Sequence, residues 1–302
     1  MPVIERLIGK RYRHAIATVE LHGEIVPLPP RGIGHAVTPA HVRDVLDEVA
    51  GDRNVKGVIF DINSPGGAIV ASREVSAAVE AFPKPTVAWI RDVGASGAYE
   101  VATACRRIVA DPFSLVGSIG VILPHVEVVD LLGKIGVRAE VLKAGRLKDL
   151  GVPLRAMTDE ERRLLQDDLE VAHRAFLERV AARRRLSPEQ QDEVRSGRVF
   201  HGERALALGL VDELGSRKEA IRACEELGGF THDEVVPFKK GRRAGFLGRV
   251  VDFFSGEEGI DAGAGAAGLL ALAGARLGAS LVEGAVAALA ARLRAPLGPP
   301  RA

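Results

Sequence analysis

The chain has 302 residues, of which 47% are hydrophobic and 27% charged, and its formal net charge is +1. This is the composition of an ordinary soluble protein with one large or two modest cores, and the near-zero charge gives no reason to expect nucleic acid as a partner. The only cysteines, Cys105 and Cys224, form no CxxC motif, so neither a metal site nor a disulfide framework is expected. Residues 1–21 contain neither a signal-peptide core nor a spanning helix.

Strand-like and helix-like segments alternate through the first third of the chain. Apolar runs predict strands at 15–21, 55–62 and 86–90. Thr38 and Pro39 open a predicted helix that Gly51 ends, and a second helix is expected at 68–82. The order strand, loop, helix, strand is that of a right-handed βαβ unit, so the class is α/β with a mostly parallel sheet. Loops 65–67 and 94–97 then lie at the carboxyl ends of strands, where ligands bind in such sheets.

The pattern continues more loosely toward residue 238. Strands are predicted at 107–110, 120–123 and 138–143, with a helix at 126–135 between the last two. A capping box of Thr158 and Glu161 opens a long helix that ends near Leu186. Shorter helices, expected to cover the sheet or a neighbouring subunit, follow at 188–194, 202–208 and 216–227.

The composition changes after Phe238, which divides the chain into a domain of residues 1–238 and a tail of residues 239–302. Residues 239–249 carry five basic side chains, and 262–291 are almost entirely Ala, Gly, Leu and Val. The longest uncharged run, 262–275, is too short to span a bilayer. Membrane contact through 239–296 and a flexible or self-associating tail are both open. A tail that occupies the active site as a pseudo-substrate is a further hypothesis.

Ser96 is the first candidate for a catalytic group. It stands between a predicted strand and a small-residue helical run, where a hydroxyl is exposed and the neighbouring amides are unpaired at the positive end of a helix dipole. That geometry suits a nucleophile whose attack creates an oxyanion. Taken alone, the segment is more simply a tight turn with a capping serine. A G-x-S-x-G elbow is excluded because residue 98 is Ala, so a Ser-His-Asp triad is not expected.

Other short motifs occur in a specific order around this serine, and any one of them alone is weak evidence. Together they resemble the signal peptide peptidase A family of serine-lysine membrane-associated peptidases, over roughly residues 14–225. The segments that carry the resemblance are Asn63-Ser64-Pro65-Gly66-Gly67, Gly94-Ala95-Ser96-Gly97-Ala98-Tyr99, Gly117-Ser118-Ile119-Gly120-Val121, Gly145-Arg146-Leu147-Lys148-Asp149, Gly197-Arg198-Val199-Phe200 and Leu210-Val211-Asp212-Glu213-Leu214-Gly215.

The resemblance implies a role for each matching residue. Ser96 matches the nucleophile, Lys148 the general base, and Ser118 a second serine that orients the lysine. Gly67 matches the oxyanion-hole glycine, whose amide would act with that of Gly97. The implied fold is the Clp protease/crotonase-like spiral of βαβ units with a helical C-terminal arm. Protomers would form a ring in which neighbouring subunits share the serine and the lysine, with no cofactor or metal.

Elementary chemistry adds a requirement for the lysine. A lysine accepts a proton only when it is neutral, and with an ordinary pKa of about 10.4 only about one in 2,500 is neutral at pH 7. A useful base therefore needs burial worth about 4 kcal/mol, which a subunit interface near Leu147 and Leu150 could supply. Asp149 would oppose this if its carboxylate faced the amine of Lys148, so we expect it to point away.

The sequence thus predicts a serine endopeptidase that cleaves extended apolar peptides, such as remnant signal peptides and membrane-protein fragments. A crotonase-like acyl-CoA enzyme and an inactive peptide-binding scaffold of the same fold are the alternatives. Family members usually begin with a membrane-spanning helix, and this sequence shows none. The expected location is therefore at a membrane without an N-terminal anchor, with the cytoplasm as the alternative.

Overall fold

A computed structural model describes residues 12–28 and 36–238. These residues form two compact units. The first, called the sheet unit here, contains described residues up to 122 and from 164 to 238; the second, the loop unit, contains residues 123–163. The tail 239–302 lies outside the described residues, so the predicted division at residue 238 remains a prediction.

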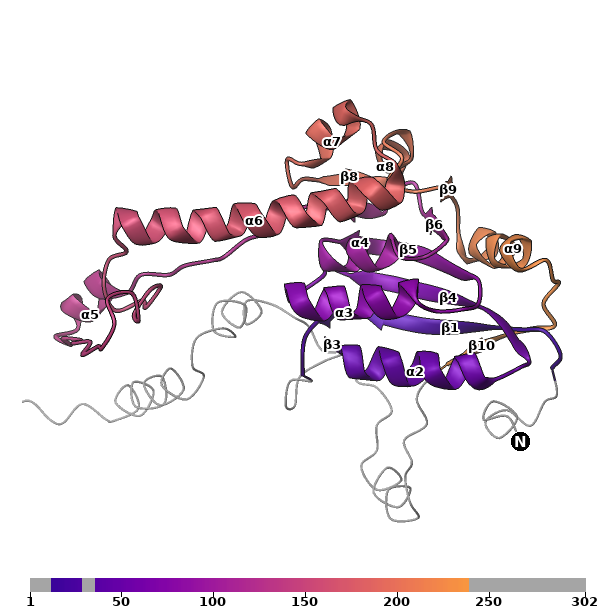
Figure 1. Ribbon diagram of the computed structural model, residues 1–302, viewed down its shortest axis with the longest axis horizontal. Helices are drawn as coiled ribbons and strands as arrows, with labels where there is room; N and C mark the ends of the chain where they lie inside the picture. The colour runs from indigo at the N-terminus through magenta and orange to yellow at the C-terminus, as the bar shows by residue number, and fades with distance from the viewer. Residues whose placement is uncertain (1–11, 29–35, 239–302) are drawn as a thin grey trace, which may run out of the picture. The chain divides into compact units, whose positions relative to one another are not determined.

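The sheet unit is built on an eight-stranded sheet in the order β10-β1-β4-β5-β6-β9, with β7 beside β5 and β8 beside β7. All its pairings are parallel except that of β7 with β8 (Figure 1). The predicted α/β class with a mostly parallel sheet is confirmed. Its strands are β1 (Ala15–His22), β4 (Val55–Ser64), β5 (Thr86–Ala95), β6 (Arg107–Ala110), β7 (Leu115–Gly117), β8 (Val199–His201), β9 (Glu213–Leu214) and β10 (Glu234–Pro237). A separate pair joins β2 (Glu24–Ile25) to β3 (Ala36–Val37).

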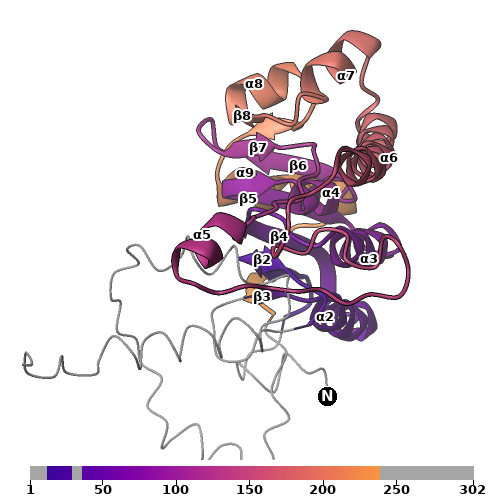
Figure 2. The same cartoon turned by 90° about the vertical axis from the view of Figure 1, so that its left-hand side faces the viewer.

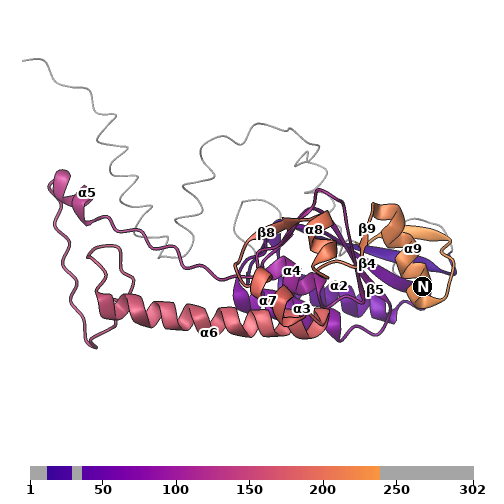
Figure 3. The same ribbon diagram turned by 90° about the horizontal axis from the view of Figure 1, so that it is seen from above.

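Helices cover both faces of the sheet. One face carries α2 (Pro39–Gly51), α3 (Ile69–Glu80) and α4 (Gly97–Ala102), whose apolar sides form the main core with β1, β4 and β5. The other carries α9 (Arg217–Gly228), which packs on a smaller apolar cluster (Figure 2). The remaining helices are α5 (Val129–Lys134), α6 (Asp159–Arg184), α7 (Pro188–Val194) and α8 (Gly202–Ala207), and α6 is one continuous helix (Figure 3).

The sheet unit follows the predicted elements closely, for local reasons. Thr38 accepts a hydrogen bond from the His41 amide and so begins α2, as its sequence predicts. Thr158 and Glu161 form the predicted capping box at the start of α6. Central strand β4 is buried along nearly its whole length, as expected of a strand covered on both faces. Within 12–28 and 36–238, no helix has the length and hydropathy that a bilayer crossing requires.

Two predicted strands are wrong. Residues 120–123 and 138–143 form no strand, and most of 121–148 is exposed. Their apolar side chains mimic a strand pattern, but an isolated strand is unstable without a neighbour to accept its backbone hydrogen bonds. The strand in this region is β7 (Leu115–Gly117), which has only three residues but a partner on each side.

Candidate active site

Ser96 stands at the junction of β5 and α4 in a rare backbone conformation. Its φ is 53° and its ψ −126°, a region that L residues seldom adopt and that costs about 1–3 kcal/mol. Only three non-glycine residues in the described chain have positive φ: Ser96, Ser118 and Arg185. The Ser96 side chain is half-buried and makes no capping hydrogen bond to α4. The strained turn therefore presents the hydroxyl rather than using it to cap the helix.

The loop after β4 packs directly against this turn. Gly66 has φ +95°, and a Cβ added to it would lie 2.6 Å from the Gly97 nitrogen. Gly67 forms a bridge with Ile25, and an added Cβ would lie 2.0 Å from the Ile25 carbonyl oxygen. The bridge uses the Gly66 carbonyl and the Ala68 amide. Only glycine fits at either position, so backbone approaches backbone here.

The amides of Gly67 and Gly97 are available at this junction. In the described chain, neither donates a hydrogen bond to another residue. The first amides of a helix have no acceptor within it, and Gly97 is the first residue of α4. A Cβ added to Gly97 would lie 3.5 Å from the Gly67 nitrogen and 2.1 Å from Ser72 Oγ. The two unused amides are therefore close neighbours, as an oxyanion hole requires.

Ser118 lies beside Ser96 because their strands are paired in register. Ala95 of β5 faces Gly117 of β7, and the Ser96 amide donates to the Gly117 carbonyl at 2.8 Å. Ser118 has φ 52° and donates its amide to the Arg198 carbonyl at 2.9 Å. Ser96 and Ser118, both in strained backbone conformations, therefore lie side by side, each directly after the end of its strand.

A buried ion pair supports the helix that follows Ser96. Glu100 is almost fully buried in α4, and Arg179 of α6 donates to its carboxylate at 2.7 Å. Arg183, one turn further along α6, donates to Ser76 Oγ at 2.8 Å and pairs with Glu80 of α3. These contacts hold α4, and α3 beside it, against α6. The sequence analysis missed them, because partners 79 and 103 residues apart leave no local pattern.

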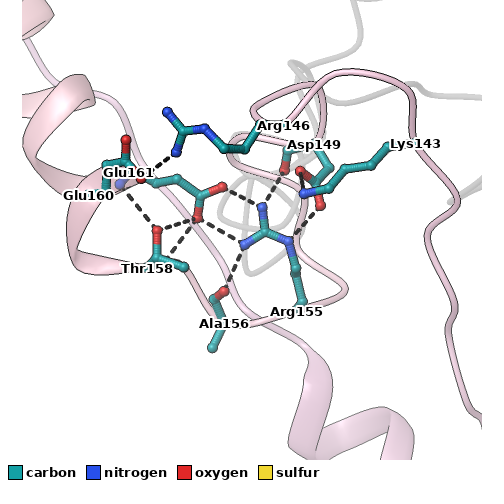
Figure 4. Close-up of polar contacts among 8 residues, drawn as sticks. All are labelled: Lys143, Arg146, Asp149, Arg155, Ala156, Thr158, Glu160 and Glu161. Carbon is teal, nitrogen blue, oxygen red and sulfur yellow. Dashed lines mark hydrogen bonds and ion pairs between the residues drawn. The ribbon is translucent and has the colours of Figure 1, made fainter.

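Lys148 belongs to the loop unit and is described within it. Its side chain is exposed in the single chain, whereas the neighbouring Asp149 is buried. Asp149 accepts hydrogen bonds from Lys143 and Arg155 (Figure 4). This agrees with the expectation that its carboxylate points away from the amine of Lys148. Of the five predicted site residues, the structure brings together Ser96, Gly97, Gly67 and Ser118 in the sheet unit and holds Lys148 in the loop unit.

Two residues in contact with the predicted site residues, and one in contact with the neighbour of Lys148, were not predicted. Gly66 packs against the turn at Ser96, and Ser72 Oγ is buried against Gly97 without a hydrogen-bond partner in the described chain. Arg155 holds Asp149. In the sequence, the glycine pair 66–67 could have pointed to Gly66, and the capping box of Thr158 could have pointed to Arg155. Nothing in the sequence marked Ser72. Across 12–28 and 36–238, no group of three or more His, Cys, Asp or Glu side chains is placed to hold a metal ion.

Comparison with known proteins shows similarity to peptidases, both in a family model and in individual relatives. Residues 79–231 match the model of peptidase family S49. A putative protease of Methanocaldococcus jannaschii is 35% identical over 223 residues, covering 71% of this chain and 72% of that protein. A putative signal peptide peptidase of Enterococcus faecium is 31% identical, covering 64% of this chain and 57% of its own length. The chloroplastic serine protease SPPA of Arabidopsis thaliana is 32% identical, and the match covers 71% of this chain but only 32% of that protein.

Similarity to solved structures is remote and includes both peptidases and a member of the enoyl-CoA hydratase/isomerase family. A variant of a membrane-bound stomatin-specific protease, in complex with a substrate peptide, is 12% identical to this chain. That match covers 80% of this chain and 99% of the other, at a TM-score of 0.49.

Proposed function

Because the chain belongs to peptidase family S49, and is therefore a serine peptidase of the signal peptide peptidase type, we propose that Ser96 is its nucleophile and Lys148 its general base. The observation that supports the nucleophile best is the strained turn at Ser96 with two unused amides beside it. A backbone held at such cost is typical of a reactive site. The family resemblance of the segment 145–149 supports the base.

The proposed reaction follows from these positions. The neutral amine of Lys148 takes the proton of Ser96 as Oγ attacks the peptide carbonyl carbon. The carbonyl oxygen becomes an oxyanion that accepts hydrogen bonds from the Gly67 and Gly97 amides, each worth about 3 kcal/mol in the usual case. The lysine then gives its proton to the leaving amine as the C–N bond breaks, which leaves an acyl ester on Ser96. Water, deprotonated by the same lysine, hydrolyses this ester, and the lysine returns the proton to Ser96 Oγ. Ser118, whose strand end lies beside that of Ser96, would accept from or donate to that lysine and so orient it.

A homo-oligomer, in which one subunit's lysine serves a neighbour's serine, agrees with the surface of the loop unit. Lys148 is exposed in the single chain, although a neutral lysine requires burial. Large apolar side chains are also exposed nearby in the sequence, more than a monomer usually leaves in one segment. Within residues 123–142 of the loop unit they are Leu123, Val126, Val129, Leu131, Ile135, Val137 and Leu142. A second copy of the chain would cover such a surface; a ring is the closed form that the resemblance implies.

The proposed substrates are extended, apolar peptides, such as remnant signal peptides or fragments of membrane proteins. An extended peptide can add as a strand beside the loop of Gly67, where backbone groups already approach closely. Membrane association through the tail 239–302 stays part of the proposal, and that tail lies outside the described residues.

Paired variants test the dyad and its sharing between subunits. Ser96→Ala and Lys148→Ala should each abolish cleavage of an unfolded apolar peptide, while Ser196→Ala and Lys218→Ala, both at exposed positions, should not. Co-assembly of the two inactive variants should restore part of the activity, because some sites then receive an intact serine and an intact lysine. Parent-like cleavage by either single variant would show that the dyad is assigned wrongly.

The alternatives predict different chemistry at Ser96. A phosphonate reagent specific for activated serines should label Ser96 in the parent and not in Lys148→Ala. An acyl-CoA enzyme does not need an activated serine, and an inactive scaffold would bind peptide without being labelled. Membership of a peptidase family favours the hydrolase over both.

A further inference from the structure

A four-residue ion network lies next to Lys148 in the loop unit (Figure 4). The Asp149 side chain is 4% exposed, and each of its oxygens has its own cation. Lys143 Nζ donates to Oδ1 at 2.5 Å, and Arg155 Nε donates to Oδ2 at 2.6 Å. The other two nitrogens of Arg155 donate hydrogen bonds to the Glu161 carboxylate, Nη1 to Oε2 at 2.8 Å and Nη2 to Oε1.

Glu161 connects this network to the beginning of α6. Its Oε2 accepts from the Thr158 amide at 2.9 Å and from the Thr158 hydroxyl at 3.1 Å, and its own amide donates back to that hydroxyl. Arg155 therefore joins the loop that carries Lys148 to the rigid first turn of a 26-residue helix. Turn hydrogen bonds from Lys148 to Gly145 and from Val152 to Asp149 complete the loop.

The charges in the network balance. Two cations, Lys143 and Arg155, face two anions, Asp149 and Glu161. Hydrogen bonds from Arg155 first and Lys143 second hold the pKa of Asp149 well below its ordinary value. The hydrogen bond from Arg155 and those from Thr158 lower the pKa of Glu161 to about 2. Both carboxylates are thus ionised at neutral pH, and each lies against a basic side chain.

We propose that Arg155 is a positioning residue for the general base: it holds the Asp149 carboxylate inside the loop unit, so that Lys148 points outward beside no free negative charge. This rests on the proposed function. Without Arg155, Asp149 would keep only its bond to Lys143 at Oδ1. Its free Oδ2 would then be within reach of the amine of Lys148, the preceding residue in the chain. An opposite charge at 4–6 Å favours the protonated form of an amine, which cannot act as a base.

The pH dependence of kcat/KM, measured on the assembled full chain, tests this. Arg155→Gln should move the midpoint of the acidic limb upward by about 1 pH unit, with activity recovering toward that of the parent at higher pH. The double variant Asp149→Asn/Arg155→Gln should return the midpoint to the parent value, because it also removes the released carboxylate. A merely structural role would lower activity at every pH without moving the midpoint.

The loop offers a matched control in Arg146, which pairs with Glu160 on the exposed side and does not touch Asp149. Arg146→Gln should leave the midpoint unchanged. If Arg155→Gln does not fold, Arg155→Lys keeps the cation but cannot reach both carboxylates, and it should give a smaller shift of the same sign. An unmoved midpoint in a folded Arg155 variant, or no return in the double variant, overturns the inference.

The Ser96→Ala and Lys148→Ala variants in the same assay separate the two proposals. If both are inactive and the Arg155 midpoint does not move, only the role of Arg155 is wrong. If either remains active, the dyad itself is wrong, and the role of Arg155 fails with it.

Discussion

The turn of the proposed nucleophile Ser96 (the nucleophile turn) and the loop of the proposed base Lys148 (the lysine loop) are held in place by different physical means. Ser96 is fixed by backbone: strands paired in register on one side, and glycines so close that no Cβ fits on the other. The loop of Lys148 has no strand partner and is fixed by side-chain charge, through Asp149, Arg155 and Glu161. The first arrangement depends on steric fit and is insensitive to pH. The second loses its ion pairs when the carboxylates are protonated. The turn and the loop should therefore be disrupted by different perturbations, the turn by steric change and the loop by low pH.

The largest effect is expected from adding one methyl group at the nucleophile turn. In Gly97→Ala the new Cβ would lie 2.1 Å from Ser72 Oγ, which is buried. The turn must shift and carry an oxyanion amide with it, so kcat/KM should fall by about 100-fold or more. Kinetics on the folded variant measure this.

Two further variants test whether steric fit is the cause. Ser72→Gly in the Gly97→Ala background removes the colliding side chain and should recover part of the loss. Gly51→Ala adds the same methyl at the end of α2, where nothing lies within 4 Å, and should leave activity unchanged. If Gly97→Ala kept full activity, the turn would not be sterically constrained, and the contrast with the lysine loop would disappear.

A smaller effect, on stability rather than chemistry, is expected behind the turn. Arg179→Met leaves the buried Glu100 carboxylate without its ion-pair partner and should lower the free energy of unfolding of the sheet unit by about 3 kcal/mol. Denaturant unfolding followed by thiol reactivity can report it. Both cysteines of the chain are buried, and burial raises the pKa of Cys224 to about 12, so they react when the unit opens.

The double variant Arg179→Met/Glu100→Gln should recover most of that loss, because no unpaired charge then stays buried. Arg195→Gln, which breaks an exposed pair with Asp192, should change the free energy of unfolding by less than about 0.5 kcal/mol. Equal losses in Arg179→Met and Arg195→Gln would show that burial of Glu100 has no energetic consequence.

The same division explains what the sequence could predict. The helices and the longer strands of the sheet unit were predicted to within a few residues, because buried strands and capped helices have local patterns of apolar residues and breakers. The long strand β4 and helix α2 are examples, whereas the short strands β7 to β10 were not predicted. Of the helix and two strands predicted within 120–143, only the helix exists, as α5. Many apolar residues of the loop unit are exposed, and the sequence alone does not distinguish an exposed apolar residue from a buried one.

The candidate site shows the same limit. Motif order alone pointed to Ser96, Gly97, Gly67 and Ser118, which strand register then brings side by side. No spacing rule could identify the partners of Asp149, since Lys143 and Arg155 lie six residues away on either side in a segment without helix or strand. Such contacts exist only after the chain has folded back on itself.

The smallest expected effect is a local opening of the lysine loop in acid. Because the folded pKa of Glu161 is depressed from 4.5 to about 2, its contribution to stability is present above about pH 4.5 and is lost as pH falls toward 2. Asp149 acts in the same direction. Hydrogen exchange, corrected for intrinsic rate, should therefore show amides of 143–161 losing protection over this range.

The comparison is decided by what the nucleophile turn does over the same range and by one substitution. Amides of 93–98 should keep their protection, since the strand pairing and steric fit of this turn involve no titrating side chain. Glu161→Gln should exchange faster than the parent at neutral pH and show much less dependence on pH, because the titrating group is gone. If 93–98 opened in parallel with 143–161, or if Glu161→Gln kept the parent's pH dependence, charge would not be what holds the loop. The ion network would then be a consequence of the loop's conformation rather than its cause.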